Sequence, residues 1–363
     1  MALTIVWAAW AGWSLLGQAT PYTLRVIDDA GTPVAGAVVD VSGDQAGTTG
    51  DEGLLEMEWN RSSRVLEVSA PGHIARTVTL EESPGETFDV VLNARVLRGR
   101  VVDTDGIGVQ SARVTAGAAS AVSDEEGHFQ LRGAEPGQVS VSRPAWMSTG
   151  FAWDGGPGEN VIQIEPFSAR AVHISAEAVS ENYADFIEMA NNTELNAVMI
   201  DLKDESGIVW YDSANPTAIE AGAVRSLFDL ESVVNQAKEA DLYVIGRLVI
   251  FQDPVAAKAL PDMAVWDDAV NGPLNTNNQY FLDPTDPAAR EYALGLAIES
   301  CEAGVDEVQF DYVRFPDRRP ETSQFDGGVS AEVRVTTITN FLHEAVATLH
   351  RMGCAVAADI FGF

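Results

Sequence analysis

The second half of this 363-residue chain is constrained most by one pattern, in which short apolar runs alternate with longer segments of helical period. The runs predict strands, and the segments between them predict helices. We expect strands at 171–175, 197–202, 242–250, 305–312 and 355–360, and helices at 183–191, 230–240, 287–303 and 330–352. A run such as Ala197-Val198-Met199-Ile200 is apolar throughout, which is typical of a parallel strand covered on both faces. Such strands form either an open doubly wound sheet or a closed (β/α)8 barrel.

Ionisable side chains stand where four of these strands end. The groups are Asp201, Lys203 and Asp204 after the second strand, Arg247 on the third, Asp311 with Tyr312 and Arg314 after the fourth, and Asp359 after the fifth. Because parallel strands open their carboxyl ends at one edge, we expect these groups to share one site. Structural ion pairs around a barrel rim are the alternative. No glycine-rich phosphate loop follows the first strand, which argues against nucleotide binding.

Several longer blocks make the pattern more specific. They are LNAVMIDLKDESGIVWYDS, LYVIGRLVIFQDP, YFLDPTDPAAREY, VDEVQFDYVRFP and AVAADIFG, in this order. Together they resemble a bacterial glycoside hydrolase family that is catalogued as a domain of unknown function in the TIM-barrel glycosidase superfamily. The resemblance covers residues 170–363. It implies a (β/α)8 barrel acting on a polysaccharide or glycan, and we expect neither a cofactor nor a metal.

A closed barrel of this type has eight strands, and the pattern supplies five before Phe363. We therefore expect an incomplete barrel of about five βα units, either a fragment of a longer product or a truncated gene. Such an open piece would expose the edges of its first and fifth strands.

Glycoside hydrolysis uses two carboxyl groups on either side of the scissile bond. We expect Asp311 to be the nucleophile or base, with Arg314 beside it keeping its pKa low. Asp359 is the first choice for the partner acid, because the apolar strand before it and Phe361 after it would raise its pKa. A carboxyl in strands six to eight is an equal alternative.

The remaining strand-end groups are expected to contact substrate. Asp201, Lys203 and Asp204 would bind sugar hydroxyls, while Arg247 and Tyr312 would position the sugar ring. A carbohydrate-binding barrel without catalysis is the main alternative function. A barrel lyase or deacetylase is another, although a deacetylase needs metal ligands that no His/Asp cluster supplies.

Residues 22–166 are β in character and contain an internal repeat. The segment 26–34 (VIDDAGTPV) returns at 101–109 (VVDTDGIGV), an offset of 75. The segment Gly50-Asp51-Glu52-Gly53 returns as Asp124-Glu125-Glu126-Gly127, with the offset now 74. The Asp and Gly positions suit tight turns, and the Val and Ala positions suit half-buried strands.

Both copies resemble carboxypeptidase-regulatory-like domains, which are small β-sandwiches of the prealbumin type. Glu-Gly replaces the usual Asp-Gly in each copy. The resemblance implies two all-β sandwich repeats at 22–94 and 95–166 that act as spacer or binding modules. Three aromatic residues near the end of the second copy would form either a sugar-stacking surface or core packing: Trp146, Phe151 and Trp153.

The charge is strongly acidic. Asp and Glu number 54 against 22 Lys and Arg, a net charge of −32. A surface of this sign repels nucleic acid and anionic lipid, so we exclude both as partners. Adaptation to high salt and simple solubility both remain explanations.

The segment Met1–Ala19 is apolar and carries no charge. It predicts a secretory signal, with Gly17-Gln18-Ala19 as the cleavage site, and a single membrane anchor is the alternative. We therefore expect a protein that is secreted or held in the cell envelope, with membrane association through the N-terminus in the second case.

Two cysteines, Cys301 and Cys354, are too few for a disulfide framework. We expect buried free thiols, with a single disulfide as the alternative. The five histidines show no metal-ligand spacing.

Overall fold

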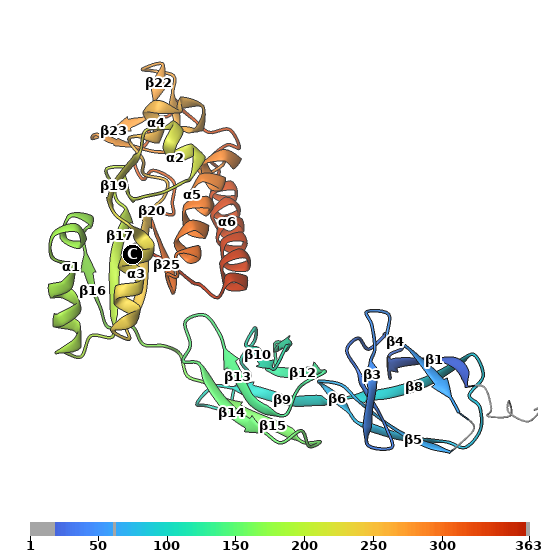
Figure 1. Cartoon of the computed structure of the whole chain (residues 1–363). Helices are drawn as coiled ribbons and strands as arrows, with labels where there is room; N and C mark the ends of the chain where they lie inside the picture. Colours follow the sequence, from blue (N-terminus) through green and yellow to red (C-terminus); the bar gives the residue numbers. More distant parts are fainter. Residues whose placement is uncertain (1–18, 61–62, 361–363) are drawn as a thin grey trace, which may run out of the picture. The chain divides into compact units, whose positions relative to one another are not determined.

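A computed structural model describes residues 19–60 and 63–360 of the chain (Figure 1). The predicted signal segment therefore lies outside the described residues except for Ala19, and so does Phe361. The chain divides into two compact units. The first takes in the chain up to Arg143 and Met147–Glu165, and the second takes in Pro144–Trp146 and the chain from Pro166.

The first unit begins with eight strands in two antiparallel-rich sheets. They are β1 Thr20–Asp28, β2 Val38–Val41, β3 Asp44–Thr48, β4 Leu54–Trp59, β5 Arg64–Ser69, β6 His73–Ile74, β7 Arg76–Leu80 and β8 Thr87–Ala94. The sheet orders are β4-β1-β8-β6 and β3-β2-β5-β7. One apolar core draws residues from both sheets, among them Leu24 and Leu92 of the first and Leu66 and Val68 of the second.

Seven further strands complete this unit. They are β9 Val96–Val102, β10 Arg113–Ala116, β11 Ala119–Val122, β12 His128–Arg132, β13 Gly137–Ser142, β14 Thr149–Trp153 and β15 Glu159–Gln163. They form sheets ordered β12-β9-β15 and β11-β10-β13-β14. Trp153 is buried on β14, while Trp146 and Phe151 are half-buried.

The sequence repeat reappears as repeated hydrogen bonds. Asp28 accepts the N–H groups two and four residues ahead of it, and Asp103 does the same in the second copy. The turn glycines also match: Gly53 and Gly127 both have positive φ, and a Cβ would lie 2.4 Å from the Val26 carbonyl and 2.2 Å from its counterpart at Val101. The two turns therefore both require glycine.

Five parallel strands form the centre of the second unit. They are β16 Ala171–Ile174, β17 Ala197–Lys203, β20 Tyr243–Val249, β25 Glu307–Asp311 and β27 Ala355–Ala358. Each pairs in parallel with the next in chain order. The five strands predicted from the apolar runs are thus confirmed, with ends within a few residues of those expected.

Four long helices follow four of these strands: α1 Ala176–Asn191, α3 Leu230–Glu239, α5 Pro287–Glu302 and α6 Ala331–Met352. Each starts at a side chain that caps its first turn: Ser175, Asp229, Asp286 and Ser330. The first helix begins at Ala176, where Ser175 supplies its cap, and it has a kink at the non-helical residue Asn182, directly before the predicted start at residue 183. Figure 1 shows α5 and α6 alongside each other, and the two helices are in contact.

Short elements that the sequence pattern does not predict follow β17, β20 and β25. They are β18 Val209–Tyr211, α2 Pro216–Glu220, β19 Val224–Phe228, α4 Ala256–Ala259, η1 Pro261–Met263, β21 Trp266–Asp267, β22 Gly272–Pro273, β23 Asn275–Thr276, β24 Gln279–Tyr280 and β26 Ser323–Gln324. They extend the chain at the carboxyl ends of the parallel strands, where loops of a parallel α/β sheet carry sites.

The helices cover one face of the parallel sheet. The main core contains alternate strand residues such as Ile200, Leu248 and Phe310 together with helix residues such as Val234 and Leu296. The other residues of the same strands point to the opposite face, because side chains alternate along a strand. From the sequence we expected both faces of the sheet to be covered. The second face is instead partly polar, since it bears His173, Asp201, Arg247, Gln309 and Asp311.

The expected free thiols are wrong: Cys301 and Cys354 form a disulfide, with their Cα atoms 5.8 Å apart. Cys301 lies in the last turn of α5, and Cys354 lies directly before β27. These two segments meet because β27 pairs with β25, the strand that follows α5. The bond therefore fixes β27 to a helix four elements earlier in the chain.

We predict that the unreduced, denatured protein has no titratable thiol, and that Cys301→Ser with Cys354→Ser lowers the free energy of unfolding by about 2–4 kcal/mol. The bond closes a loop across a sequence separation of 53 residues. Ellman titration and urea unfolding followed at 222 nm measure both effects. Two free thiols in the unreduced protein would contradict the pairing.

Candidate active site

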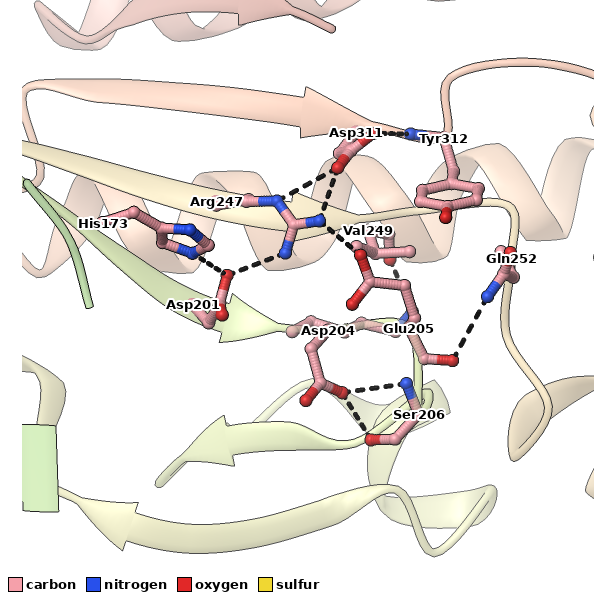
Figure 2. Close-up of polar contacts among 11 residues, drawn as sticks. His173, Asp201, Asp204, Glu205, Ser206, Arg247, Val249, Gln252, Asp311 and Tyr312 are labelled. Atoms are coloured by element: carbon pink, nitrogen blue, oxygen red, sulfur yellow. Dashed lines mark hydrogen bonds and ion pairs between the residues drawn. The ribbon is translucent and has the colours of Figure 1, made fainter. Parts of the chain in front are cut away.

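Arg247 is the centre of a charged cluster on the second face of the sheet (Figure 2). It projects from β20, is buried, and donates Nη1 to Asp201 at 2.8 Å and Nη2 to Glu205 at 2.5 Å. It also donates Nε to Asp311 at 3.0 Å, and its Nη2 bonds the same carboxylate oxygen. Burial lowers the pKa of Arg247, but the bonds to Asp201, Glu205 and Asp311 raise it above its ordinary value. One guanidinium thus joins groups from β17, the loop after it, and β25.

His173 extends the cluster onto β16. Its Nε2 lies 2.8 Å from Asp201 Oδ1, the oxygen that also accepts from Arg247. Asp201 is buried, whereas the His173 side chain is half exposed. Two neighbours thus share Oδ1 of Asp201, and His173 forms the solvent side of this end of the cluster.

Glu205 belongs to the cluster although sequence reasoning missed it. Its side chain is 44% exposed, so it faces solvent more than Asp201 or Asp311 does. Burial raises the pKa of Glu205, but the hydrogen bond from Arg247, a backbone hydrogen bond and the charges of Arg247 and His173 together outweigh burial, and the net pKa is lowered. Glu205 is therefore an ionised, accessible carboxylate beside Asp311.

Asp311 ends β25 and is held from two directions. Its Oδ2 accepts from Arg247, and its Oδ1 accepts the Tyr312 backbone N–H at 2.7 Å. Tyr312 has φ of +52°, a conformation unfavourable for a bulky residue. In Figure 2 the Tyr312 ring points from the end of β25 toward the part of the view that holds Glu205 and Gln252. Burial, followed by the charges of Glu205 and Asp311, raises the pKa of the Tyr312 hydroxyl, so it stays a neutral donor.

Two of the predicted substrate contacts lie elsewhere. Lys203 is fully buried, donates Nζ to the Val249 carbonyl at 2.6 Å and pairs with Asp253 at 3.0 Å. The pairing of β17 with β20 shifts register between Asp201 and Lys203, which turns Lys203 away from the face that Asp201 occupies. Asp204 instead accepts from the backbone and hydroxyl of Ser206 and holds a turn. Neither group joins the Arg247 cluster.

Arg314 was expected beside Asp311, whereas Arg247 supplies the guanidinium that Asp311 binds. Arg314 pairs with Asp317 at 2.6 Å, and its guanidinium carbon lies 5.1 Å from the Tyr312 ring centroid. The Arg314 guanidinium and the Tyr312 ring thus form a cation–π pair next to the cluster.

Asp359 follows β27 and is exposed. Phe310 pairs with Ala358, and the Asp359 N–H bonds the Phe310 carbonyl at 2.9 Å. The register therefore places Asp359 beside Asp311 on the neighbouring strand. No contact joins its side chain to the Arg247 cluster within residues 19–60 and 63–360.

Three carboxylates against one guanidinium leave a net charge of about −2 when all are ionised. Negative charge of this kind stabilises an oxocarbenium-like transition state. The Arg247 guanidinium also lies between the three carboxylates, in the position that a metal cation would otherwise take. Elsewhere in the described part of the chain, one group has metal-ligand spacing, the exposed turn residues Asp124, Glu126 and His128.

We predict that Arg247→Met lowers the free energy of unfolding by about 3 kcal/mol or more, because it leaves buried carboxylates without their cation. Arg225→Met on the exposed part of β19 is the matched control and should change stability by about 0.5 kcal/mol or less. Urea unfolding followed at 222 nm reports the long helices, all in the second unit. Equal losses in the two variants would contradict the role given to Arg247.

A second prediction concerns pH. Because the folded pKa of Glu205 is lowered, its ionisation adds stability above its ordinary pKa, and this is lost as pH falls through the lower folded value. Glu205→Gln should therefore cost up to about 1 kcal/mol at pH 7, since the group is partly exposed, and less at about pH 3, below the ordinary glutamate pKa. Urea unfolding of both proteins at the two pH values measures the difference. A cost that persists unchanged at acid pH would contradict this account.

Comparison with known proteins identifies a family for the second unit. The family model described as "Putative glycosyl hydrolase domain" matches residues 171–363. Among solved structures, a hypothetical protein from Ruminiclostridium thermocellum ATCC 27405 is 34% identical, over 52% of this chain and 97% of that one, with a TM-score of 0.47. No curated protein matches the chain.

Two more distant structures are described as glycoside hydrolases. The glycoside hydrolase domain of PelA from Pseudomonas aeruginosa is 16% identical, over 53% of this chain and 60% of that one, with a TM-score of 0.32. The GH20 beta-N-acetylhexosaminidase from Streptomyces coelicolor A3(2) is 11% identical, over 54% of this chain and 40% of that one, with a TM-score of 0.36. This chain thus spans less than two thirds of either of these proteins. The family model covers more than half of this chain, and the chain belongs to the glycosyl hydrolase domain family that the model describes.

Proposed function

We propose that the second unit hydrolyses a glycosidic bond in a polysaccharide or glycan outside the cytoplasm. The observation that carries the proposal is the Arg247 cluster, in which β17, β20 and β25 bring Asp201, Arg247 and Asp311 to one place. The family description supports hydrolysis of a glycosyl bond.

We infer that the parallel strands belong to a (β/α)8 barrel, of which they form five consecutive units. Strand order follows chain order, and the long helices pack on one face. Both features are those of a barrel rather than of a doubly wound sheet, where strand order reverses and helices cover both faces. In a barrel, the second face bearing Arg247 would line the interior and its mouth.

Asp311 is the proposed nucleophile or base. Arg247 and the Tyr312 N–H fix its orientation. Two Arg247 bonds occupy Oδ2, whereas Oδ1 accepts the Tyr312 N–H and keeps a second lone pair, which would attack the anomeric carbon or take a proton from water. Its side chain is 13% exposed, which admits substrate from one side only. Arg247 acts as a positioning residue rather than the ring contact expected from sequence.

Asp359 is the proposed acid. Its register beside Asp311 places the two backbones about 4.8 Å apart, the spacing of neighbouring strands. Carboxyl groups about 5–5.5 Å apart are typical of retaining enzymes. We propose that the two side chains keep about the spacing of their backbones, and therefore that configuration is retained. Asp359 would give its proton to the leaving oxygen while Asp311 bonds the anomeric carbon. In the second step the Asp359 carboxylate would take a proton from water as the water attacks that carbon and breaks the bond to Asp311, which releases the sugar.

Glu205 is the other nearby carboxylate. It shares Arg247 Nη2 with Asp311, and two acceptors on one nitrogen lie roughly 4–5 Å apart. Its lowered pKa makes it a poor proton donor. We therefore assign it stabilisation of positive charge at the anomeric carbon, with Tyr312 and Arg314 forming the adjacent wall for the sugar ring.

Location outside the cytoplasm is supported by the disulfide, since such bonds persist in oxidising compartments. The apolar segment Met1–Ala19 would supply the export signal or anchor. No helix in the described chain is both long and apolar enough to cross a membrane. The β repeats of the first unit would then act as spacer or glycan-binding modules of the carboxypeptidase-regulatory-like kind.

A carbohydrate-binding protein without catalysis is the second candidate, favoured by the engagement of Asp201 and Asp311 in ion pairs. The two candidates differ in the expected products. A binding protein would release no reducing ends from any polysaccharide.

We predict that Asp311→Asn lowers hydrolysis by about 10³-fold or more, because it removes the nucleophile or base, while the far-ultraviolet dichroism stays unchanged. Asp185→Asn, at an exposed position of α1, is the matched control and should retain full activity. Release of reducing ends from a panel of cell-wall and matrix polysaccharides is the measurement. Full activity in the Asp311 variant would exclude its proposed role.

A further inference from the structure

We propose that a cleft lined by Arg318, Arg319 and Arg334 binds an acidic group of the glycan, a carboxylate or a sulfate. This inference rests on the proposed function and adds a substrate class to it. The cleft has a volume of about 790 Å³. Its walls come from the β23–β24 hairpin, the loop after β25 and the first turn of α6.

The charge of the cleft is opposite to that of the chain. In a protein of net charge −32, with 22 Lys and Arg, the six residues 314–319 contain three arginines. The acidic residue in the lining is Asp317, which Arg314 pairs at 2.6 Å. No ion pair involves Arg318, Arg319 or Arg334 in the part of the chain that the structure describes. Three guanidinium groups thus face one cleft with their charge uncompensated.

The cleft is held in shape by contacts on its two sides. Thr276 Oγ1 in the hairpin donates to the Arg318 carbonyl at 3.1 Å. The Arg319 guanidinium carbon lies 5.9 Å from the Phe325 ring centroid, and Phe325 in turn packs on Phe315. These contacts fix backbone and aromatic groups and leave guanidinium N–H groups available to a ligand.

Arginine suits a planar or multi-oxygen anion, because its N–H groups bind two oxygens at once. Uronate carboxylates and sulfate esters are the groups of this kind on polysaccharides. A nucleic acid offers phosphates of similar chemistry, but its dense charge would be repelled by the surrounding acidic surface. An acidic glycan carries its charges farther apart and fits a local basic cleft.

The cleft lies close to the proposed site of hydrolysis. Phe315 lines the cleft four residues after Asp311, so their Cα atoms are at most about 14 Å apart. A glycan bound at Asp311 would reach the cleft with a nearby sugar. The arginines would then select an acidic sugar at a fixed distance from the cleaved bond.

Binding measurements on the full chain test this inference. In an Asp311→Asn background, calorimetry at 0.15 M salt would compare hexagalacturonate, its methyl ester, a carrageenan oligosaccharide that carries sulfate only, and a single-stranded oligonucleotide. We expect one of the two acidic glycans to bind at least about tenfold more tightly than the ester. The sulfate and carboxylate arms show which group is preferred.

Arg318→Gln with Arg319→Gln should abolish that preference. Arg225→Gln with Arg351→Gln removes the same charge from exposed positions outside the cleft and should preserve it. Equal affinity for acidic and neutral glycans, equal loss in both double variants, or tighter binding of the oligonucleotide would overturn the inference. If the unmodified chain releases no reducing ends from any polysaccharide while the arginine effect holds, the proposed function fails and the anion site stands.

Discussion

The second unit depends on one buried guanidinium that holds together groups from separate strands. Arg247 would cost several kcal/mol to bury alone, and its three carboxylates offset that cost only because the strands bring them within bonding distance. In return, the parallel register of β17, β20 and β25 is fixed at the end where loops form a site. Structure and site chemistry therefore share the same contacts.

Periodic features were predictable from the sequence because they are local. The five parallel strands and four long helices follow from apolar spacing and capping residues, and Asp201 and Asp311 follow from the rule that parallel strands end at one edge. The directions of the side chains at 201–205 depend on the pairing of β17 with β20, so local sequence did not predict them. A register shift between Asp201 and Lys203 turns Lys203 into the core, so Glu205, one residue past the predicted group, reaches Arg247.

Long-range pairing explains the other differences. The disulfide requires α5 and β27 to meet beside β25, which the spacing of Cys301 and Cys354 does not reveal. His173 carries no signal because it is an isolated histidine within a short strand, and only strand pairing brings it to Asp201. The arginine-lined cleft likewise joins three segments that lie far apart in sequence.

The central claim is that Asp311 and Asp359, at the carboxyl ends of the adjacent strands β25 and β27, act across one glycosidic bond. Proton NMR of the first product released from a defined oligosaccharide tests it most directly, because the anomeric signal records which face was attacked. The proposed separation of the two carboxyl groups, about one strand spacing, predicts a first product with the anomeric configuration of the substrate. A first product of inverted configuration would contradict the account.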